Sequence, residues 1–212
     1  PNCPKSACPS PDYYKEAFEK AEKRAYGVTL TAELSGSYNS AMLARDLVLE
    51  ERPELQIHIF NSRSASVGET LITEKIQECE EKGMEFSEVV ETVENYINTQ
   101  NTYFVLENLE TLRKNGRLSN LKAFVASALK IKPVMGATPE GTIIQLDQAR
   151  GMNKALVKMV DYIAEAAEDP EQKILGITHC NCPERAEAVK NAILEKISVK
   201  DVILLDTAGV SS

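Results

Sequence analysis

Short apolar segments of strand length alternate with longer segments of helical periodicity along most of this chain of 212 residues. The expected strands cover 28–31, 55–60, 103–106, 131–137, 142–146, 174–178 and 202–205. The expected helices cover 11–21, 38–48, 68–81, 87–98, 109–114, 121–129, 154–167 and 184–196. Since strands that alternate with helices are typical of α/β proteins, the sequence predicts an α/β fold.

Local signals mark the first helix and a hairpin in the second half. Ser10 can cap the helix, Pro11 suits its first turn, and Asp12 suits the positive end of its dipole. The turn sequence TPEG at 138–141 separates two expected strands, which predicts a hairpin and therefore an antiparallel element. We expect a domain boundary near Asn101, which gives domains 1–101 and 102–212.

Composition excludes several classes of protein. With 43 % hydrophobic residues the chain can build a core, so intrinsic disorder is excluded. The net charge of −8 argues against a broad nucleic-acid interface, because an acidic chain repels phosphate. The longest apolar runs are only a few residues, as at 202–205, so no stable membrane insertion is expected.

Cysteine usage indicates a reducing compartment. The chain has five cysteines, an odd number that does not suggest a disulfide framework. No signal peptide is visible, so we expect a cytoplasmic protein. Residue 1 is proline, and we expect the sequence to be a fragment that begins inside a domain.

Few residues suggest catalysis or metal binding. His58 lies in the middle of an expected strand, which favours a structural role. His179 ends a strand and precedes Cys180 and Cys182. These three side chains can all bind soft metal ions, so a metal or thiol site is one alternative. A second cysteine pair with zinc-finger spacing is absent from the sequence, as are the GxSxG, Walker and GxGxxG motifs. We therefore assign no catalytic residue and no metal.

Hydroxyl groups at junctions between elements are the more informative feature. Ser35 and Ser37 flank Gly36 at a strand-to-helix turn, and Ser6 precedes the first helix. A helix N-terminus offers unpaired backbone N–H groups and a positive dipole end, so an added hydroxyl makes an uncharged cradle for carboxylate or phosphate. The alternative is that Ser35 or Ser37 only caps the helix. Arg63, in a second hydroxyl-rich turn, could add charge or only pair with an acidic neighbour.

Six stretches of the sequence are informative together: PKSACPSP (4–11), LSGSYNSA (34–41), NSRSASVG (61–68), LETLRKNGRLS (109–119), IKP (131–133) and ARG (149–151). In combination they resemble the DegV family of lipid-binding proteins. Each stretch alone is a weak signal, but all six occur in the family's order at compatible distances. The resemblance runs from one end of the sequence to the other.

The resemblance implies a fold and a binding function. It implies a parallel α/β first domain and a second α/β domain with a mixed or antiparallel sheet. A long-chain fatty acid such as palmitate is expected in a tunnel between them, with Ser6 and Ser35 holding its carboxylate. Members of this kind present the acid to a partner fatty acid kinase for phospholipid synthesis and perform no chemistry themselves. Ser37, Arg63, Arg117 and Arg150 are the expected contacts to the head group or the partner.

The sequence also departs from the family pattern. Ser6 stands where the family has Thr, Ala7 where it has Ser, and Cys8 where it has Gln. Compared with the family, an N-terminal strand-helix-strand unit and a C-terminal strand with a His-bearing loop are missing, which supports the fragment interpretation. Two alternatives remain at this point: a phosphoryl-transfer enzyme related to dihydroxyacetone kinases, and a metal or thiol protein using His179, Cys180 and Cys182.

Overall fold

The computed structural model describes residues 6–118 and 130–207, which form two compact units. The N-terminal unit comprises Ser6–Gln100 together with the short segment Pro139–Thr142. The described part of the C-terminal unit comprises 101–118, 130–138 and 143–207. The helix expected over 121–129 lies outside the described residues.

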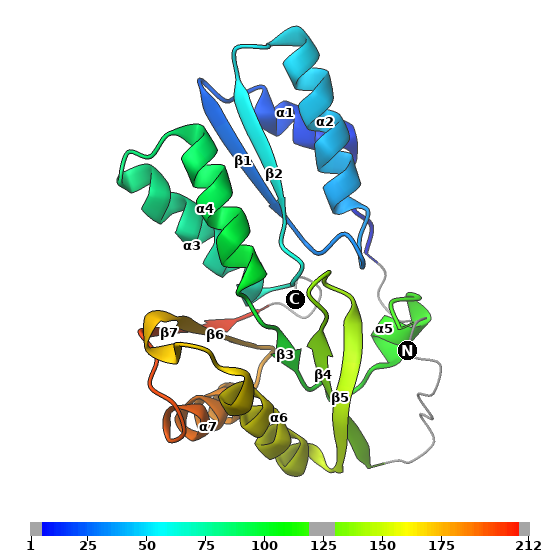
Figure 1. The fold of residues 1–212 in the computed structure, drawn as a ribbon. Coiled ribbons are helices and arrows are strands. Elements are labelled where there is room, and N and C mark those ends of the chain that lie inside the picture. The colour runs from blue at the N-terminus through cyan, green and yellow to red at the C-terminus, as the bar shows by residue number, and fades with distance from the viewer. Residues whose placement is uncertain (1–5, 119–129, 208–212) are drawn as a thin grey trace. The chain divides into compact units, whose positions relative to one another are not determined.

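The N-terminal unit contains two parallel strands and four helices (Figure 1). Its elements are α1 (Pro11–Phe18), β1 (Arg24–Thr29), α2 (Ser37–Glu51), β2 (Gln56–Asn61), α3 (Val67–Glu81) and α4 (Phe86–Asn98). The strands pair in register from Arg24 opposite Gln56 to Thr29 opposite Asn61. The first helix begins as the sequence predicts, because Ser10 is its N-cap and accepts the Tyr13 N–H at 3.3 Å.

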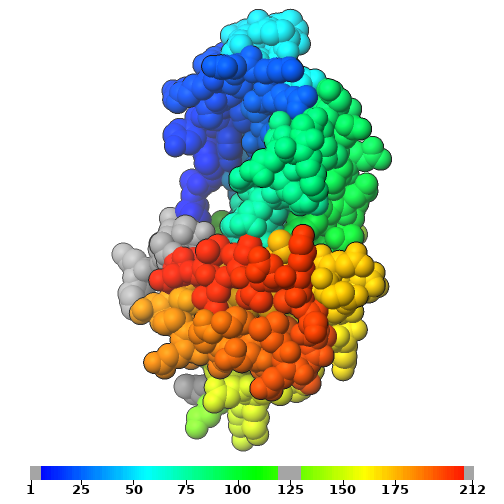
Figure 2. Space-filling model, turned by 90° about the vertical axis from the view of Figure 1, so that its left-hand side faces the viewer, coloured from blue at the N-terminus to red at the C-terminus, as the bar shows by residue number. Residues whose placement is uncertain are grey.

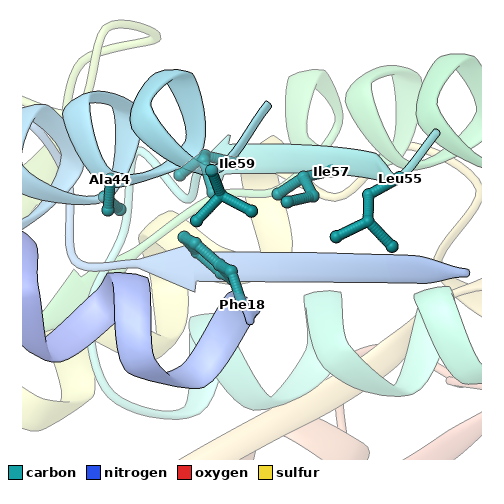
Figure 3. Packing of buried hydrophobic residues seen from close by; sticks show 7 residues of the cluster. Phe18, Ala44, Leu55, Ile57 and Ile59 are labelled. Carbon is teal, nitrogen blue, oxygen red and sulfur yellow. The ribbon is translucent and has the colours of Figure 1, made fainter. Parts of the chain in front are cut away.

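Alternation along β2 buries apolar side chains on both faces of this sheet. Ile57 and Ile59 join Phe18 of α1 and Ala44 of α2 in one core cluster (Figure 3). Phe60 belongs instead to a second cluster, formed with α3 and α4. Because successive strand residues point to opposite faces, the result is a layer of helices on each side of the sheet.

The start of β1 differs from the sequence prediction. We expected a strand over 28–31, whereas β1 begins at Arg24 and ends at Thr29. Side-chain contacts to α3 and α4 fix the first residues of β1. Arg24 Nη1 donates to Glu80 Oε1 at 3.1 Å, and the Tyr26 ring stacks on the Phe86 ring with centroids 5.3 Å apart. These partners lie far along the chain, so a pattern of local hydrophobicity could not identify them.

The C-terminal unit combines an antiparallel sheet with a separate parallel strand pair. The antiparallel sheet has the order β3 (Tyr103–Phe104), β4 (Ile131–Ala137), β5 (Ile143–Arg150), and the parallel pair is β6 (Ile174–His179) with β7 (Asp201–Asp206). The helical elements are α5 (Glu110–Lys114), α6 (Met152–Ala166), the 3₁₀ turn Pro170–Gln172 and α7 (Pro183–Leu194). The α/β class, with parallel and antiparallel sheets, is confirmed, and so is the hairpin of β4 and β5.

The core of this unit lies between β4, β5, α6 and α7. Val134, Ala155, Val160 and Ile193 are buried there. The strand β7 is less well covered: its four central residues are half-buried, and residues at this end of the chain (red) reach the surface in Figure 2. Within the described residues, no helix combines the length and the apolar character that a membrane span requires.

The first core cluster gives a stability prediction. Ile59 is 1 % exposed, so Ile59→Ala removes buried methylenes and leaves a cavity, at a cost of about 2–5 kcal/mol. We expect a markedly lower urea midpoint. The control is Leu43→Ala on α2, where the side chain is 52 % exposed and the midpoint should change little. Equal effects of the two substitutions would contradict the core described here.

Candidate anion-binding site

The carboxyl ends of β1 and β2 bring two loops and two helix starts to the same edge of the sheet. Parallel strands end at a common edge, and here Thr29 lies opposite Asn61. The loop after β1 leads to α2, and the loop after β2 leads to α3. In open α/β sheets, ligands bind beyond this edge.

Hydrogen bonds tie the two loops together. The side-chain oxygen of Asn61 accepts the backbone N–H of Ala32 at 3.0 Å and that of Arg63 at 3.3 Å. The backbone N–H of Thr31 donates to Ser64 O at 3.0 Å. Asn61 therefore orders both loops, a role that the sequence analysis did not assign to it.

The second loop uses one of its hydroxyls internally. Ser62 Oγ donates to Ser64 O at 2.9 Å and accepts the Ser64 N–H at 3.1 Å. Both serines are buried, and Ser62 is only 1 % exposed. Ser62 therefore stabilises the turn itself.

Ser35 and Ser37 form a hydroxyl pair at the start of α2. Their Oγ atoms are 2.8 Å apart, and the Ser37 N–H donates to Ser35 Oγ at 3.2 Å. Gly36 occupies the N-cap position, and no side chain makes the usual cap hydrogen bond. Gly36 rather than either serine is the N-cap residue, but Ser35 Oγ accepts the first N–H of α2, so a purely capping role for Ser35 stays one of the two alternatives.

The segment before α1 runs past this helix start. Cys8 Sγ lies 4.0 Å from Ser40 Oγ, and a Cβ added at Gly36 would be 3.2 Å from Cys8 Sγ. Glycine at position 36 therefore leaves room for Cys8 at the first turn of α2. Ser6, two residues earlier, is exposed.

Burial shifts the pKa of two groups near the hydroxyl pair upward. Burial raises the pKa of Tyr14, and interaction with the Ser37 side chain offsets part of that rise. Burial also raises the pKa of Glu69 in the first turn of α3, partly opposed by a hydrogen bond from the Ser66 backbone N–H. In both cases burial favours the neutral form over the charged one.

The turn between β4 and β5 is also part of this unit. Thr31 Oγ1 donates to Gly141 O at 3.2 Å, and Thr142 Oγ1 contacts Glu33 Oε2 at 3.3 Å. Gly141 has φ of +90°, and a Cβ there would be 2.2 Å from Thr31 Oγ1 and 2.7 Å from Arg63 Cα. Both the conformation and the space at this position therefore require glycine.

The three candidate arginines have different surroundings. Arg63 Nη1 donates to Asn98 Oδ1 at 2.6 Å, and its Nη2 is 4.0 Å from Glu94. Pairing with an acidic neighbour is one of the two roles that the sequence left open for Arg63. Arg117, half-buried after α5, and Arg150, exposed at the end of β5, belong to the C-terminal unit. Their contacts with a head group or a partner stay predictions.

The histidines have local partners. His58 Nε2 is 3.3 Å from Glu94 Oε1, and its ring packs edge-on against Phe60. The side chain of His179 is 7 % exposed; its Nδ1 accepts the Cys182 N–H at 3.4 Å and lies 3.3 Å from Asp206 Oδ1. In the part of the chain that the structure describes, no three His, Cys, Asp or Glu residues are grouped so as to hold a metal ion. His179 instead stabilises the turn from β6 to α7.

These features define the N-terminal unit as a helix-covered parallel α/β layer with a pair of hydroxyls at the edge where its strands end. The chain belongs to the DegV family, because the family model described as "Uncharacterised protein, DegV family" matches residues 1–212. A DegV domain-containing protein of Streptococcus pneumoniae is 37 % identical over 208 residues, which are 98 % of this chain and 73 % of the relative.

Two solved structures of the family add ligand information about those proteins. A DegV family protein from Ruminococcus gnavus, refined with vaccenic acid, is 58 % identical to this chain and superimposes with a TM-score of 0.94. The match covers 99 % of this chain and 75 % of the Ruminococcus gnavus chain. The fatty acid kinase (Fak) B3 protein of Streptococcus pneumoniae, loaded with linoleic acid, is 36 % identical with a TM-score of 0.86. That match covers 96 % of this chain and 72 % of the other.

Gly141→Ala tests the contact between the hairpin turn and the loop after β1. The added Cβ meets Thr31 Oγ1 and the backbone of Arg63, and a φ of +90° is strained for alanine. We expect a loss of about 1–3 kcal/mol in the free energy of unfolding, measured in urea. Gly83→Ala is the control, because Gly83 has φ of +69° but no neighbour within 4 Å of the added Cβ. If Gly83→Ala lowers the free energy of unfolding as much as Gly141→Ala does, the positive φ and not the contact with Thr31 and Arg63 accounts for the loss.

The raised pKa of Glu69 predicts a pH dependence of stability. Between the ordinary glutamate pKa and the raised value, the folded state binds more protons than the unfolded state, so stability falls as pH rises. Glu69→Gln removes this titration and retains a side chain that can cap the helix. We expect the variant to gain stability over wild type as pH rises through this window, and the difference to be smallest below it. Urea midpoints at several pH values measure this, and a pH-independent difference contradicts it.

Proposed function

We propose that this protein binds a long-chain fatty acid and carries it without performing chemistry on it. In the proposal, the hydroxyls of Ser6 and Ser35 hold the carboxylate at the edge of the N-terminal sheet. The observation that carries it is the Ser35–Ser37 hydroxyl pair at the start of α2, with Oγ atoms 2.8 Å apart. It is supported by the fatty acids bound to two family members, of which one is 58 % identical to this chain.

The chemistry of the cradle suits a carboxylate. Removing a carboxylate from water without compensation is costly, so hydrogen-bond donors must replace the lost water. Hydroxyls and the first N–H groups of α2 supply such donors without adding a full charge. A head group held in this way remains accessible to a second protein, which a carrier requires.

The acyl chain supplies most of the affinity in this proposal. Each buried methylene contributes about 0.8 kcal/mol, so a long chain compensates for the cost of ordering the ligand. The tunnel between two domains that the family resemblance implies stays a prediction. The proposal needs no cofactor and no metal.

We further propose a partner fatty acid kinase that phosphorylates the presented carboxylate in the cytoplasm. The support is the description of one solved relative as a fatty acid kinase B3 protein. Acyl phosphate should form only when this protein, fatty acid, ATP and the kinase are combined. Turnover of ATP by the isolated protein would favour a phosphoryl-transfer enzyme instead.

Organic extraction of the purified protein gives the first test of binding. Mass spectrometry of the extract should show a long-chain fatty acid in near-stoichiometric amount. Protein purified without ligand should also bind added palmitate. A protein that carries no acid and fails to bind added palmitate would contradict the proposal.

Ser35→Ala tests the role of the hydroxyl. Loss of one hydrogen bond to a charged group costs about 1.5–3 kcal/mol, which corresponds to a loss of roughly 10- to 100-fold in palmitate affinity. Ser87→Ala, an exposed serine on α4, is the matched control and should bind as wild type does. Titration calorimetry of ligand-free protein measures both, and unchanged binding by Ser35→Ala would exclude Ser35 as a carboxylate ligand.

A further inference from the structure

The turn between β6 and α7 carries two thiols that the proposed function does not use. Cys180 and Cys182 are both free cysteines, of which Cys180 is exposed and Cys182 is half-buried. Asn181 between them has φ of +52°, a left-handed conformation that bends the chain. Cys182 is the N-cap residue of α7, so both thiols lie where β6 ends and this helix begins.

The spacing of the two cysteines brings their Cα atoms into the range of a disulfide. Two residues of fully extended chain span at most about 7 Å. The bend at Asn181 makes the span from Cys180 to Cys182 shorter than that limit. The Cα atoms of disulfide-bonded cysteines are usually about 4.4–6.8 Å apart. A bridge between Cys180 and Cys182 is therefore compatible with the path of the chain.

Such a bridge suits a reversible redox site better than a structural role. A disulfide stabilises a protein mainly by closing a loop of the unfolded chain, and with one intervening residue there is little loop to close. Exposed or strained disulfides are the ones that are easily reduced. In a reducing compartment, those that form are usually transient and catalytic or redox-sensing.

We propose that Cys180 and Cys182 form a redox-modification site that exchanges with low-molecular-weight disulfides such as oxidised glutathione. The exposed Cys180 attacks the S–S bond of oxidised glutathione, which gives a mixed disulfide and releases one reduced glutathione. Cys182 then attacks the sulfur of Cys180, which closes the protein disulfide and releases the second reduced glutathione. The two protein thiols are oxidised, the glutathione disulfide is reduced, and each departing sulfur takes up the proton that the attacking thiol loses.

Closing the bridge changes the contacts that hold this turn. The N–H of Cys182 donates to His179 Nδ1 at 3.4 Å, and the N–H of Asn181 donates to Asp206 Oδ1 at 3.3 Å. Both nitrogen atoms are members of the ring that a bridge from Cys180 to Cys182 closes. The ring constrains the backbone torsions beside them, so oxidation weakens both hydrogen bonds and loosens the link from this turn to the end of β7.

The experiment equilibrates the full chain with mixtures of reduced and oxidised glutathione in the absence of air. The remaining thiols are alkylated, and the peptide that contains both cysteines is analysed by mass spectrometry without reduction. As the share of oxidised glutathione rises, Cys180 and Cys182 should escape alkylation together, and the peptide should be lighter by two hydrogens. Excess reduced glutathione should reverse the change. Continued alkylation of both thiols, a lasting glutathione adduct on Cys180, or a bridge from either residue to Cys8 would overturn the proposal.

Single substitutions test the roles assigned to the two thiols. Cys182→Ser keeps the exposed thiol and removes the one that closes the bridge, so a glutathione adduct on Cys180 should accumulate. Cys180→Ser leaves only the half-buried thiol, so Cys182 should form its adduct more slowly than Cys180 does in the first variant. Equal rates in the two variants would overturn the order of the two steps.

Hydrogen exchange of the reduced and oxidised wild-type chain tests the effect on the turn. We expect the N–H groups of Asn181 and Cys182 to exchange about two- to tenfold faster in the oxidised form, as the loss of one ordinary hydrogen bond implies. The N–H of Val160, in the middle of α6, is the control and should exchange equally in both forms. Equal exchange at Asn181 and Cys182 would overturn the change at the turn. These measurements involve no fatty acid, so their outcome is separate from that of the proposed function.

Discussion

The parallel pairing of β1 with β2 is the constraint on which the candidate site depends. Because the two strands end side by side, the helix starts that follow them lie at one edge of the sheet. Asn61 holds this arrangement by accepting a backbone N–H from each loop. The helices on both faces of the sheet, packed through Ile59 on one side and Phe60 on the other, fix the strands in turn.

The cradle at this edge is polar but carries little charge. Ser35 and Ser37 provide hydroxyls, and burial favours the neutral forms of Tyr14 and Glu69. The Arg63 guanidinium is engaged with Asn98 and Glu94. Neutral donors can hold a carboxylate without the strong attraction of a buried cation, which fits the carrier role proposed for this protein.

Features encoded by neighbouring residues could be predicted from the sequence. The Ser10 cap, the hairpin of β4 and β5 and the helix after Gly36 all follow from short-range patterns. The contact of Gly141 with Thr31 could not be predicted, because 110 residues separate the partners. For the same reason the sequence did not predict that β1 begins at Arg24, whose side chain pairs with the distant Glu80. Their positions at junctions between elements singled out Ser6 and Ser35, the family resemblance added the role of carboxylate ligands, and that role stays a prediction.

The most direct measurement of the central claim is the titration of a bound fatty acid whose carboxyl carbon is isotope-labelled, followed by NMR. Donors from Ser35 and the start of α2 should stabilise the ionised carboxyl, so its pKa should be below that of the same acid in a detergent micelle. Ser35→Ala should raise that pKa. A bound carboxyl that titrates as it does in the micelle, with no response to Ser35→Ala, would contradict the account.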